Sequence, residues 1–178
     1  MKLLTIVGSL QIKSSNRALV ALASHRAPPG VEMAPYSSLG ELPHYNSDLD
    51  TDSPPEVVTE WRSRLSAADG VLIASPEYGH GAPGSLKNAL DWIVGSGEFV
   101  NKPVAATCAA QGAGRGLMGL AMLLQTLRAI DAKVVWSEPV IVARASIDER
   151  GHIMDPDVGQ QIDQLLSVLV AAVGAGSR

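Results

Sequence analysis

Hydroxyl and amide side chains gather in one short segment near the start of the chain, residues 8–16, which reads GSLQIKSSN. It follows an apolar run at 3–7 and precedes a stretch of helical composition at 17–23. A turn between a strand and a helix N-terminus offers unpaired backbone N–H groups and the positive end of the helix dipole, which together bind anions. We expect a phosphate monoester to be held there by Ser9, Ser14, Ser15 and Asn16. The alternative is that Ser15 or Asn16 only caps the helix.

The spacing of this turn matches neither GxGxxG nor GxxxxGK[ST]. Those two patterns mark the dinucleotide fingerprint and the P-loop of NTPases, so both classes are disfavoured. A mononucleotide phosphate, which lacks the extended pyrophosphate, fits the turn better.

A second candidate segment is 75–92, with the sequence SPEYGHGAPGSLKNALDW. The apolar run 71–74 leads into it, two prolines and three glycines keep the next residues out of helix and strand, and a helical pattern resumes at Ser85. In an open α/β sheet, the loops at the carboxyl ends of strands form the ligand crevice, so this rigid loop is a candidate site wall. The alternative is a surface loop that needs turn residues.

A third loop, 110–116, is rich in glycine and follows the apolar run 104–109. Together the three loops outline a slot with a phosphate end and a flat end, which is the shape of flavin mononucleotide (FMN). A flavin ring needs close approach of the backbone and hydrogen-bond donors, and glycine permits that approach. The expected donors are the backbone N–H groups of Glu77, Tyr78, Gly79, Gln111, Gly112 and Gly114.

Strand and helix patterns alternate five times along the chain. The apolar runs do not alternate with polar residues, which is typical of parallel strands buried on both faces. The expected strands are 3–7, 31–36, 71–74, 104–109 and 134–142, the last broken or bulged at Pro139. The expected helices are 17–23, 55–67, 85–94, 117–130 and 158–173. Right-handed crossovers then favour an α/β fold with a doubly wound five-stranded parallel sheet, ordered 2-1-3-4-5, with helices on both faces.

The 178 residues fit one domain, 1–178, with a frayed tail at 174–178. The segment 37–55 is long, polar and without a pattern of its own. Long loops inside compact domains are often functional, so we expect this one to cover a site or to join an interface.

Composition excludes several kinds of partner. The formal net charge is −4 and Lys and Arg do not cluster, so we expect neither nucleic acid nor a membrane surface as a partner. The single cysteine, Cys108, excludes an internal disulfide and is expected to be a small buried hydrophobe. The first apolar run is too short for a signal-peptide core and no run reaches the ~18 apolar residues of a membrane span, so a cytoplasmic protein is expected. No metal site is expected.

The segments GSLQIKSSNRAL, SPEYGHGAPGSLKNALDW and 111–116 resemble the NADPH-dependent FMN reductase family, which includes quinone, azo-dye and chromate reductases. The resemblance covers about residues 2–128. It implies a flavodoxin-like fold, bound FMN, NADPH or NADH as co-substrate, and electron delivery to a quinone, azo dye, metal oxyanion or free flavin. It also implies a homodimer or homotetramer with the flavin near a subunit interface. On the matching positions, Ser9, Ser14 and Asn16 lie on the phosphate loop, and Pro76, Glu77 and Tyr78 line the flavin ring.

Two positions depart from the family pattern. Gln11 stands where an arginine is common, so one charge-assisted phosphate contact, worth about 1 kcal/mol net, is missing unless Lys13 or Arg17 replaces it. Gly79 stands where an asparagine is usual, which leaves room for a substrate beside the ring.

No catalytic side chain is obligatory, because the reacting atoms belong to the cofactors. Glu77 is expected to contribute its backbone only. His80 is a candidate for contact with substrate or nicotinamide, against the alternative of a solvated loop histidine. Arg115 is a candidate for an NADPH phosphate, against an exposed salt bridge.

These observations favour an FMN-dependent NAD(P)H oxidoreductase with ping-pong kinetics. Two other functions stay open. One is an FMN-binding electron carrier or regulatory module that does not oxidise nicotinamide, and the other is a site for a different phosphorylated metabolite.

Overall fold

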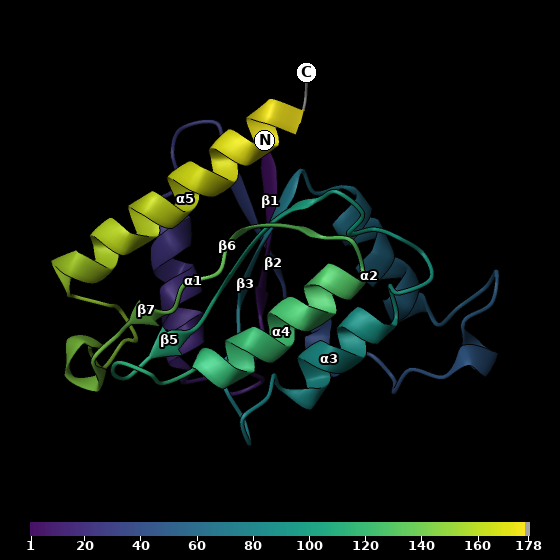
Figure 1. Ribbon diagram of the computed structural model, residues 1–178, viewed down its shortest axis with the longest axis horizontal. Coiled ribbons are helices and arrows are strands. Elements are labelled where there is room, and N and C mark those ends of the chain that lie inside the picture. The colour runs from purple at the N-terminus through teal and green to yellow at the C-terminus, as the bar shows by residue number, and fades with distance from the viewer. Residues whose placement is uncertain (177–178) are drawn as a thin grey trace.

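The computed structural model describes residues 1–176. Its main sheet has five parallel strands in the order β2-β1-β3-β4-β6, which confirms the predicted order (Figure 1). The strands are β1 (Lys2–Val7), β2 (Glu32–Tyr36), β3 (Gly70–Ala74), β4 (Pro103–Thr107) and β6 (Lys133–Trp136). β1 and β3 are neighbours at the sheet centre, so the loops that follow them meet at one edge.

Helices cover both faces of this sheet. One layer holds α1 (Ser15–His25) and α5 (Pro156–Gly176), and the other holds α2 (Glu56–Ser66), α3 (Gly84–Asp91) and α4 (Leu117–Ala129) (Figure 1). Side chains that alternate along each strand point into two separate cores. Leu3 and Leu72 pack with α1 and α5, whereas Leu4 and Ile73 pack with the other layer.

Each of the last two expected strands, 104–109 and 134–142, is divided into two shorter strands. The break in the second was predicted from Pro139. β5 (Ala109–Ala110) continues beyond β4, and β7 (Val140–Ile141) follows β6. Proline has no N–H to donate, so β6 ends before it, and β7 leaves the main sheet to form a parallel pair with β5. This small pair places the segment after Ala110 beside the segment after Ile141.

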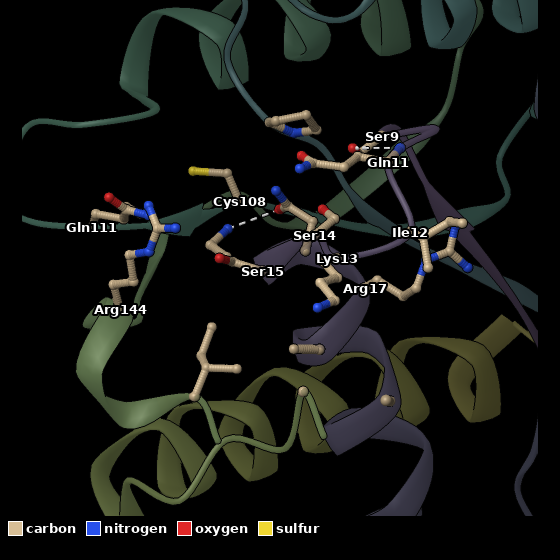
Figure 2. Close-up of a pocket in the computed structure, with 18 of the residues that line it drawn as sticks. Ser9, Gln11, Ile12, Lys13, Ser14, Ser15, Arg17, Cys108, Gln111 and Arg144 are labelled. Carbon is tan, nitrogen blue, oxygen red and sulfur yellow. Dashed lines mark hydrogen bonds between the residues drawn. The ribbon is translucent and has the colours of Figure 1, made fainter. Parts of the chain in front are cut away.

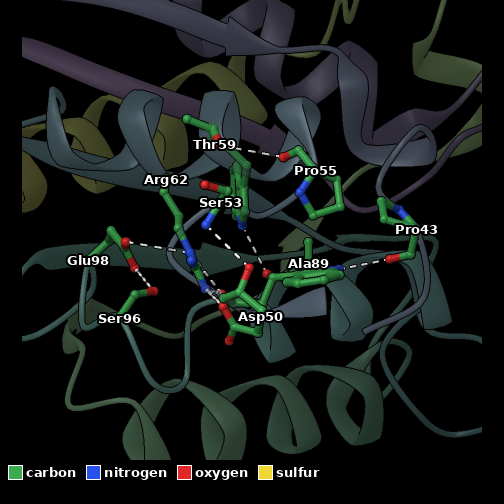
Figure 3. Close-up of polar contacts among 12 residues, drawn as sticks. Pro43, Asp50, Ser53, Pro55, Thr59, Arg62, Ala89, Ser96 and Glu98 are labelled. Carbon is green, nitrogen blue, oxygen red and sulfur yellow. Dashed lines mark hydrogen bonds and ion pairs between the residues drawn. The ribbon is translucent and has the colours of Figure 1, made fainter. Parts of the chain in front are cut away.

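The long segment 37–55 lies against α2 and α3 and contains only the short 3₁₀ turns η1 (Ser38–Gly40) and η2 (Ser47–Leu49). The Asn88 amide accepts a hydrogen bond from the Tyr45 N–H (2.7 Å) and donates one to the Pro43 carbonyl (2.9 Å). Arg62 binds Asp50 at 2.8 Å and donates to the carbonyl of the buried Trp92 (Figure 3). These contacts fasten the segment to α2 and α3, and none of its residues lines the cleft described below, so the expectation that it covers this site is wrong. That it joins an interface stays a prediction.

Helix α5 differs from the sequence prediction at both ends, since it starts at Pro156 and runs to Gly176. Residues 174–176 of the expected frayed tail are therefore helical, continuing from Val173, which packs into the core beside Leu3. Residues 177–178 of that tail lie outside the described residues. By length and composition α5 is also the one described helix that could cross a membrane, but its apolar side packs on the sheet and α1.

Candidate nucleotide-binding cleft

A cleft of about 1110 Å³ opens at the carboxyl edge of the sheet (Figure 2). Four segments supply most of its wall: 9–18, 76–78, 108–116 and 144–152. The first three are the loops singled out from the sequence, and the fold brings them together. The sequence candidates in the wall are Ser9, Gln11, Ser14, Ser15, Asn16, Pro76, Glu77, Tyr78, Gln111 and Arg115. Gly79, His80, Gly112 and Gly114 do not line it.

The N-terminus of α1 is the part of the wall whose groups suit an anion. Ser14 is the N-cap residue, with extended backbone (φ −109°, ψ 133°), and its side chain makes no capping hydrogen bond. The first intrahelical bond runs from the Ala18 N–H to the Ser14 carbonyl (3.0 Å). The N–H groups of the three residues between them have no partner inside the helix, as is usual for a first turn. Unpaired donors, a free hydroxyl and the helix dipole thus converge on one spot in the cleft.

Ser9 and Asn16 use their side chains to fasten the loops to one another. The Ser9 hydroxyl oxygen accepts the Gln11 N–H (3.2 Å) and lies 3.3 Å from the Tyr78 hydroxyl. The Asn16 side-chain carbonyl accepts the N–H of Ala109 (2.9 Å). Both side chains are almost fully buried, so these bonds hold the first loop against the second and third loops.

Gln11 lines the cleft together with Lys13 and Arg17, which lie on the same loop and first helical turn (Figure 2). Within the described chain neither Lys13 nor Arg17 makes an ion pair. Lys13 and Arg17 therefore place positive charge in the part of the wall where Gln11 replaces the arginine common in the family.

The Glu77 side chain has a role that the sequence prediction of a backbone-only residue missed. Its carboxylate accepts the N–H of Gly119 (2.9 Å) and lies 3.3 Å from the His80 ring nitrogen Nδ1. The backbone hydrogen bond from Gly119 is the main reason why the pKa of Glu77 is lowered from its ordinary 4.5, and His80 lowers it further. Glu77 thus caps the first turn of α4 and ties the second loop to the third.

This contact makes a pH-dependent prediction. Because the pKa of Glu77 is lower in the folded protein than in the unfolded chain, its ionised form stabilises the fold above the ordinary pKa, and this contribution is lost as the pH falls through the folded-state pKa. Glu77→Gln should therefore lower the free energy of unfolding at pH 7, and the difference from the wild type should shrink below about pH 4. Urea unfolding at several pH values measures it.

Glu56→Gln, in the first turn of α2, is the matched control, because its carboxylate makes no hydrogen bond or ion pair within the described residues. A Glu77→Gln difference that stays constant from pH 7 to pH 3 would contradict the capping role.

Residues 78–81 form a tight hydrogen-bonded turn at the mouth of the cleft. Tyr78 and Gly81 exchange both backbone hydrogen bonds (2.9 and 3.0 Å), and Gly79 and His80 have φ of +55° and +62°. Positive φ at both central residues favours glycine or asparagine, which explains why position 79 accepts glycine where asparagine is usual. The turn carries the exposed His80 ring outside the residues that line the cleft.

The fourth wall, 144–152, contains none of the candidate site residues predicted from the sequence. It contributes Arg144, Asp148, Glu149, Arg150 and His152. The pairing of β7 with β5 brings these residues to the cleft. Because that pairing joins distant parts of the chain, no local sequence pattern marks them as site residues.

The cleft carries an excess of positive charge although the whole chain is acidic. Its wall holds five Lys and Arg side chains and three carboxylates. The five are Lys13, Arg17, Arg115, Arg144 and Arg150, and none of them makes an ion pair among residues 1–176. Cys108 also lines the cleft, but burial raises the pKa of its thiol to about 11, so it is protonated at neutral pH.

A doubly wound parallel sheet with a cleft at its topological switch point, beside the turn that follows its first strand, defines a flavodoxin-like fold. The model of the NADPH-dependent FMN reductase family matches residues 1–146. The chain belongs to this family and is an oxidoreductase.

Known proteins resemble the chain over nearly its whole length. A NAD(P)H-dependent FMN reductase of Pseudomonas aeruginosa is 35% identical over 176 residues, covering 94% of this chain and 92% of that protein. A 2-hydroxy-1,4-benzoquinone reductase of a Burkholderia species is 31% identical, with 97% and 96% covered. Among solved structures, the flavoenzyme NAD(P)H:(acceptor) oxidoreductase FerB of Paracoccus denitrificans has 25% identity and a TM-score of 0.82, with 96% and 98% covered.

Proposed function

We propose that this protein holds FMN in the cleft and uses NADPH or NADH to reduce small-molecule acceptors, quinones first among them. The observation that carries the proposal is the N-terminus of α1, where the Ser14 hydroxyl and the N–H groups of the first turn lack partners among the described residues. These donors suit a phosphate monoester, so the residues present fit FMN.

The Ser14 hydroxyl and the N–H groups of residues 15–17 would hold the phosphate, with Lys13 and Arg17 adding charge. Residues 76–78 and 109–111 would form the walls around the flat part of the cofactor. Bound FMN supplies the hydride-accepting and electron-donating chemistry. The protein positions the cofactor, and its buried bonds between Ser9, Asn16 and the neighbouring loops keep the walls in place.

One cleft opening would serve both the nicotinamide and the acceptor, so the two would bind in turn. Initial rates measured with NADPH and a benzoquinone should give parallel double-reciprocal lines, the pattern of a ping-pong mechanism. Intersecting lines would contradict the shared opening. If the FMN-loaded protein oxidised neither NADPH nor NADH with a quinone, an azo dye or ferric ion, the oxidoreductase proposal itself would fail.

The charge of the cleft favours this function over an electron carrier. A carrier that docks protein partners is often steered by a strongly acidic rim. Here the wall has five cationic and three anionic side chains, which suits anionic small molecules.

We also propose a cytoplasmic homodimer or homotetramer. The support for an oligomer is that helix α4 leaves Leu117, Met118 and Met122 exposed, and that Tyr78 is exposed close by.

The relative named as a 2-hydroxy-1,4-benzoquinone reductase supports a quinone as the acceptor of this chain.

A further inference from the structure

We propose that Arg144 and Gln111 form a subsite for the 2′-phosphate of NADPH. This subsite rests on the proposed function, and it would make the protein prefer NADPH over NADH. Arg144 belongs to the fourth wall of the cleft, to which the proposed FMN contacts assign no role, and Gln111 lies in the third wall beside it.

The position of Arg144 is fixed by the strand pair β5–β7. Ala110 is paired with Ile141, and the Val142 N–H donates to the Ala110 carbonyl (2.8 Å). Gln111 follows β5 directly, and Arg144 comes three residues after Ile141. The two side chains therefore start from neighbouring strand ends, and Figure 2 shows both at the side of the cleft away from Lys13 and Arg17.

The backbone around Arg144 is well anchored. It begins η3 (Arg144–Ser146), in which the Ser146 hydroxyl donates to the Ala143 carbonyl (2.6 Å) and the Met154 N–H donates to the Ser146 carbonyl (2.8 Å). Ile147 and Ile153 form an antiparallel bridge that closes the turn between them. The guanidinium is thus carried by an ordered segment, which lowers the entropy cost of binding a ligand.

The carboxylates of the fourth wall do not neutralise Arg144. Asp148 accepts the N–H groups of Arg150 (2.9 Å) and His152 (2.8 Å) and contacts the His152 ring at 3.3 Å, so its bonds stay within its own turn. Glu149 makes no ion pair with Arg144 in the described part of the chain. Arg144 thus lines the cleft, and its guanidinium has no ion-pair partner among residues 1–176.

The chemistry of this pair suits a second phosphate monoester. A guanidinium presents a planar fork of N–H donors that matches two phosphate oxygens, and the Gln111 amide can donate a further hydrogen bond. The volume of about 1110 Å³ exceeds the usual range for one small ligand. The phosphate of FMN has its own donors at α1. The 2′-phosphate is the group that distinguishes NADPH from NADH, and arginine is its common partner in nucleotide-binding sites.

The test uses FMN-loaded protein and two probes, adenosine 2′,5′-bisphosphate and adenosine 5′-monophosphate, titrated by calorimetry at low ionic strength. The wild type should bind the bisphosphate at least about 10-fold more tightly, and Arg144→Gln should bring the two affinities within about 3-fold. Arg144→Gln should also lower kcat/KM for NADPH roughly 10- to 100-fold and change that for NADH less than about 3-fold. Arg144→Lys keeps the positive charge but lacks the planar fork of N–H donors. Its affinity ratio for the two probes and its kcat/KM for NADPH should lie between those of the wild type and those of Arg144→Gln.

Arg128→Gln is the matched control, since Arg128 is exposed near the end of α4 and does not line the cleft. This variant should keep the wild-type ratio of the two probe affinities and the wild-type ratio of kcat/KM for NADPH and NADH. Equal affinity of the wild type for the two probes would overturn the subsite, and so would an equal loss for NADPH and NADH in Arg144→Gln. A fall in FMN affinity in this variant, with the probe ratio kept, would assign Arg144 to the phosphate of FMN instead. Because the calorimetry needs no turnover, it tests the subsite even if the protein oxidises neither nucleotide.

Discussion

Ser14→Asp is expected to make the FMN-free protein more stable and to remove most of its FMN affinity. An aspartate at the N-cap can accept the free N–H groups of the first turn of α1, which the Ser14 side chain leaves unbonded. This cap should add about 1 kcal/mol to the free energy of unfolding. The same carboxylate would lie where the FMN phosphate is expected. Repulsion between the two negative groups should weaken FMN binding by at least about 100-fold.

Ser14→Asn separates charge from capping, because asparagine caps as well as aspartate and is neutral. It should gain similar stability and lose much less FMN affinity than Ser14→Asp. Thermal unfolding and quenching of FMN fluorescence measure the two quantities. Equal FMN affinity in both variants would mean that no phosphate sits at this helix end.

Gly119→Ala is expected to damage both the fold and the cleft. A Cβ at this position would lie 2.9 Å from the Cα and Cβ atoms of Glu77 and 3.0 Å from the Gly81 carbonyl oxygen. Backbone cannot give way as a flexible side chain can, so α4 must move away from the second loop. Such overpacking costs about 1–3 kcal/mol, and it would also break the bond from the Gly119 N–H to Glu77. We expect FMN affinity to fall at least about 10-fold as the two walls separate.

Gly84→Ala is the matched control, because Gly84 also lies in the first turn of a helix but has open space where a Cβ would lie. Alanine there should stabilise the protein by up to about 1 kcal/mol by restricting the unfolded chain. Urea unfolding and FMN titration compare the two variants. Gly119→Ala with wild-type stability and FMN affinity would show that close contact between α4 and the second loop is not needed.

The fold could be predicted from the sequence because the signals for its strands and helices are local. Unbroken apolar runs such as 71–74 indicated buried parallel strands, and the crossover rules then fixed their order. Pro139 predicted the division of the last strand for the same local reason, the missing N–H donor. Three walls of the cleft were found because glycine, proline and serine mark loops at strand ends.

The remaining features depend on contacts between distant residues, which no local pattern encodes. The capping role of Glu77 needs Gly119, 42 positions later, to approach within hydrogen-bonding distance. The fourth wall at 144–152 reaches the cleft only because β7 pairs with β5. The segment 37–55 had the length and polarity of a lid, but the amide of Asn88 and the guanidinium of Arg62 hold it against the helices.

The most direct measurement is a titration of the FMN-free protein with FMN and, separately, with riboflavin, which has the same ring and no phosphate. If the turn after β1 binds the phosphate of a flavin, FMN should bind at least about 100-fold more tightly than riboflavin, and Ser14→Asp should remove most of that difference. Equal affinities for the two flavins, or no binding of either, would contradict an FMN site at this cleft.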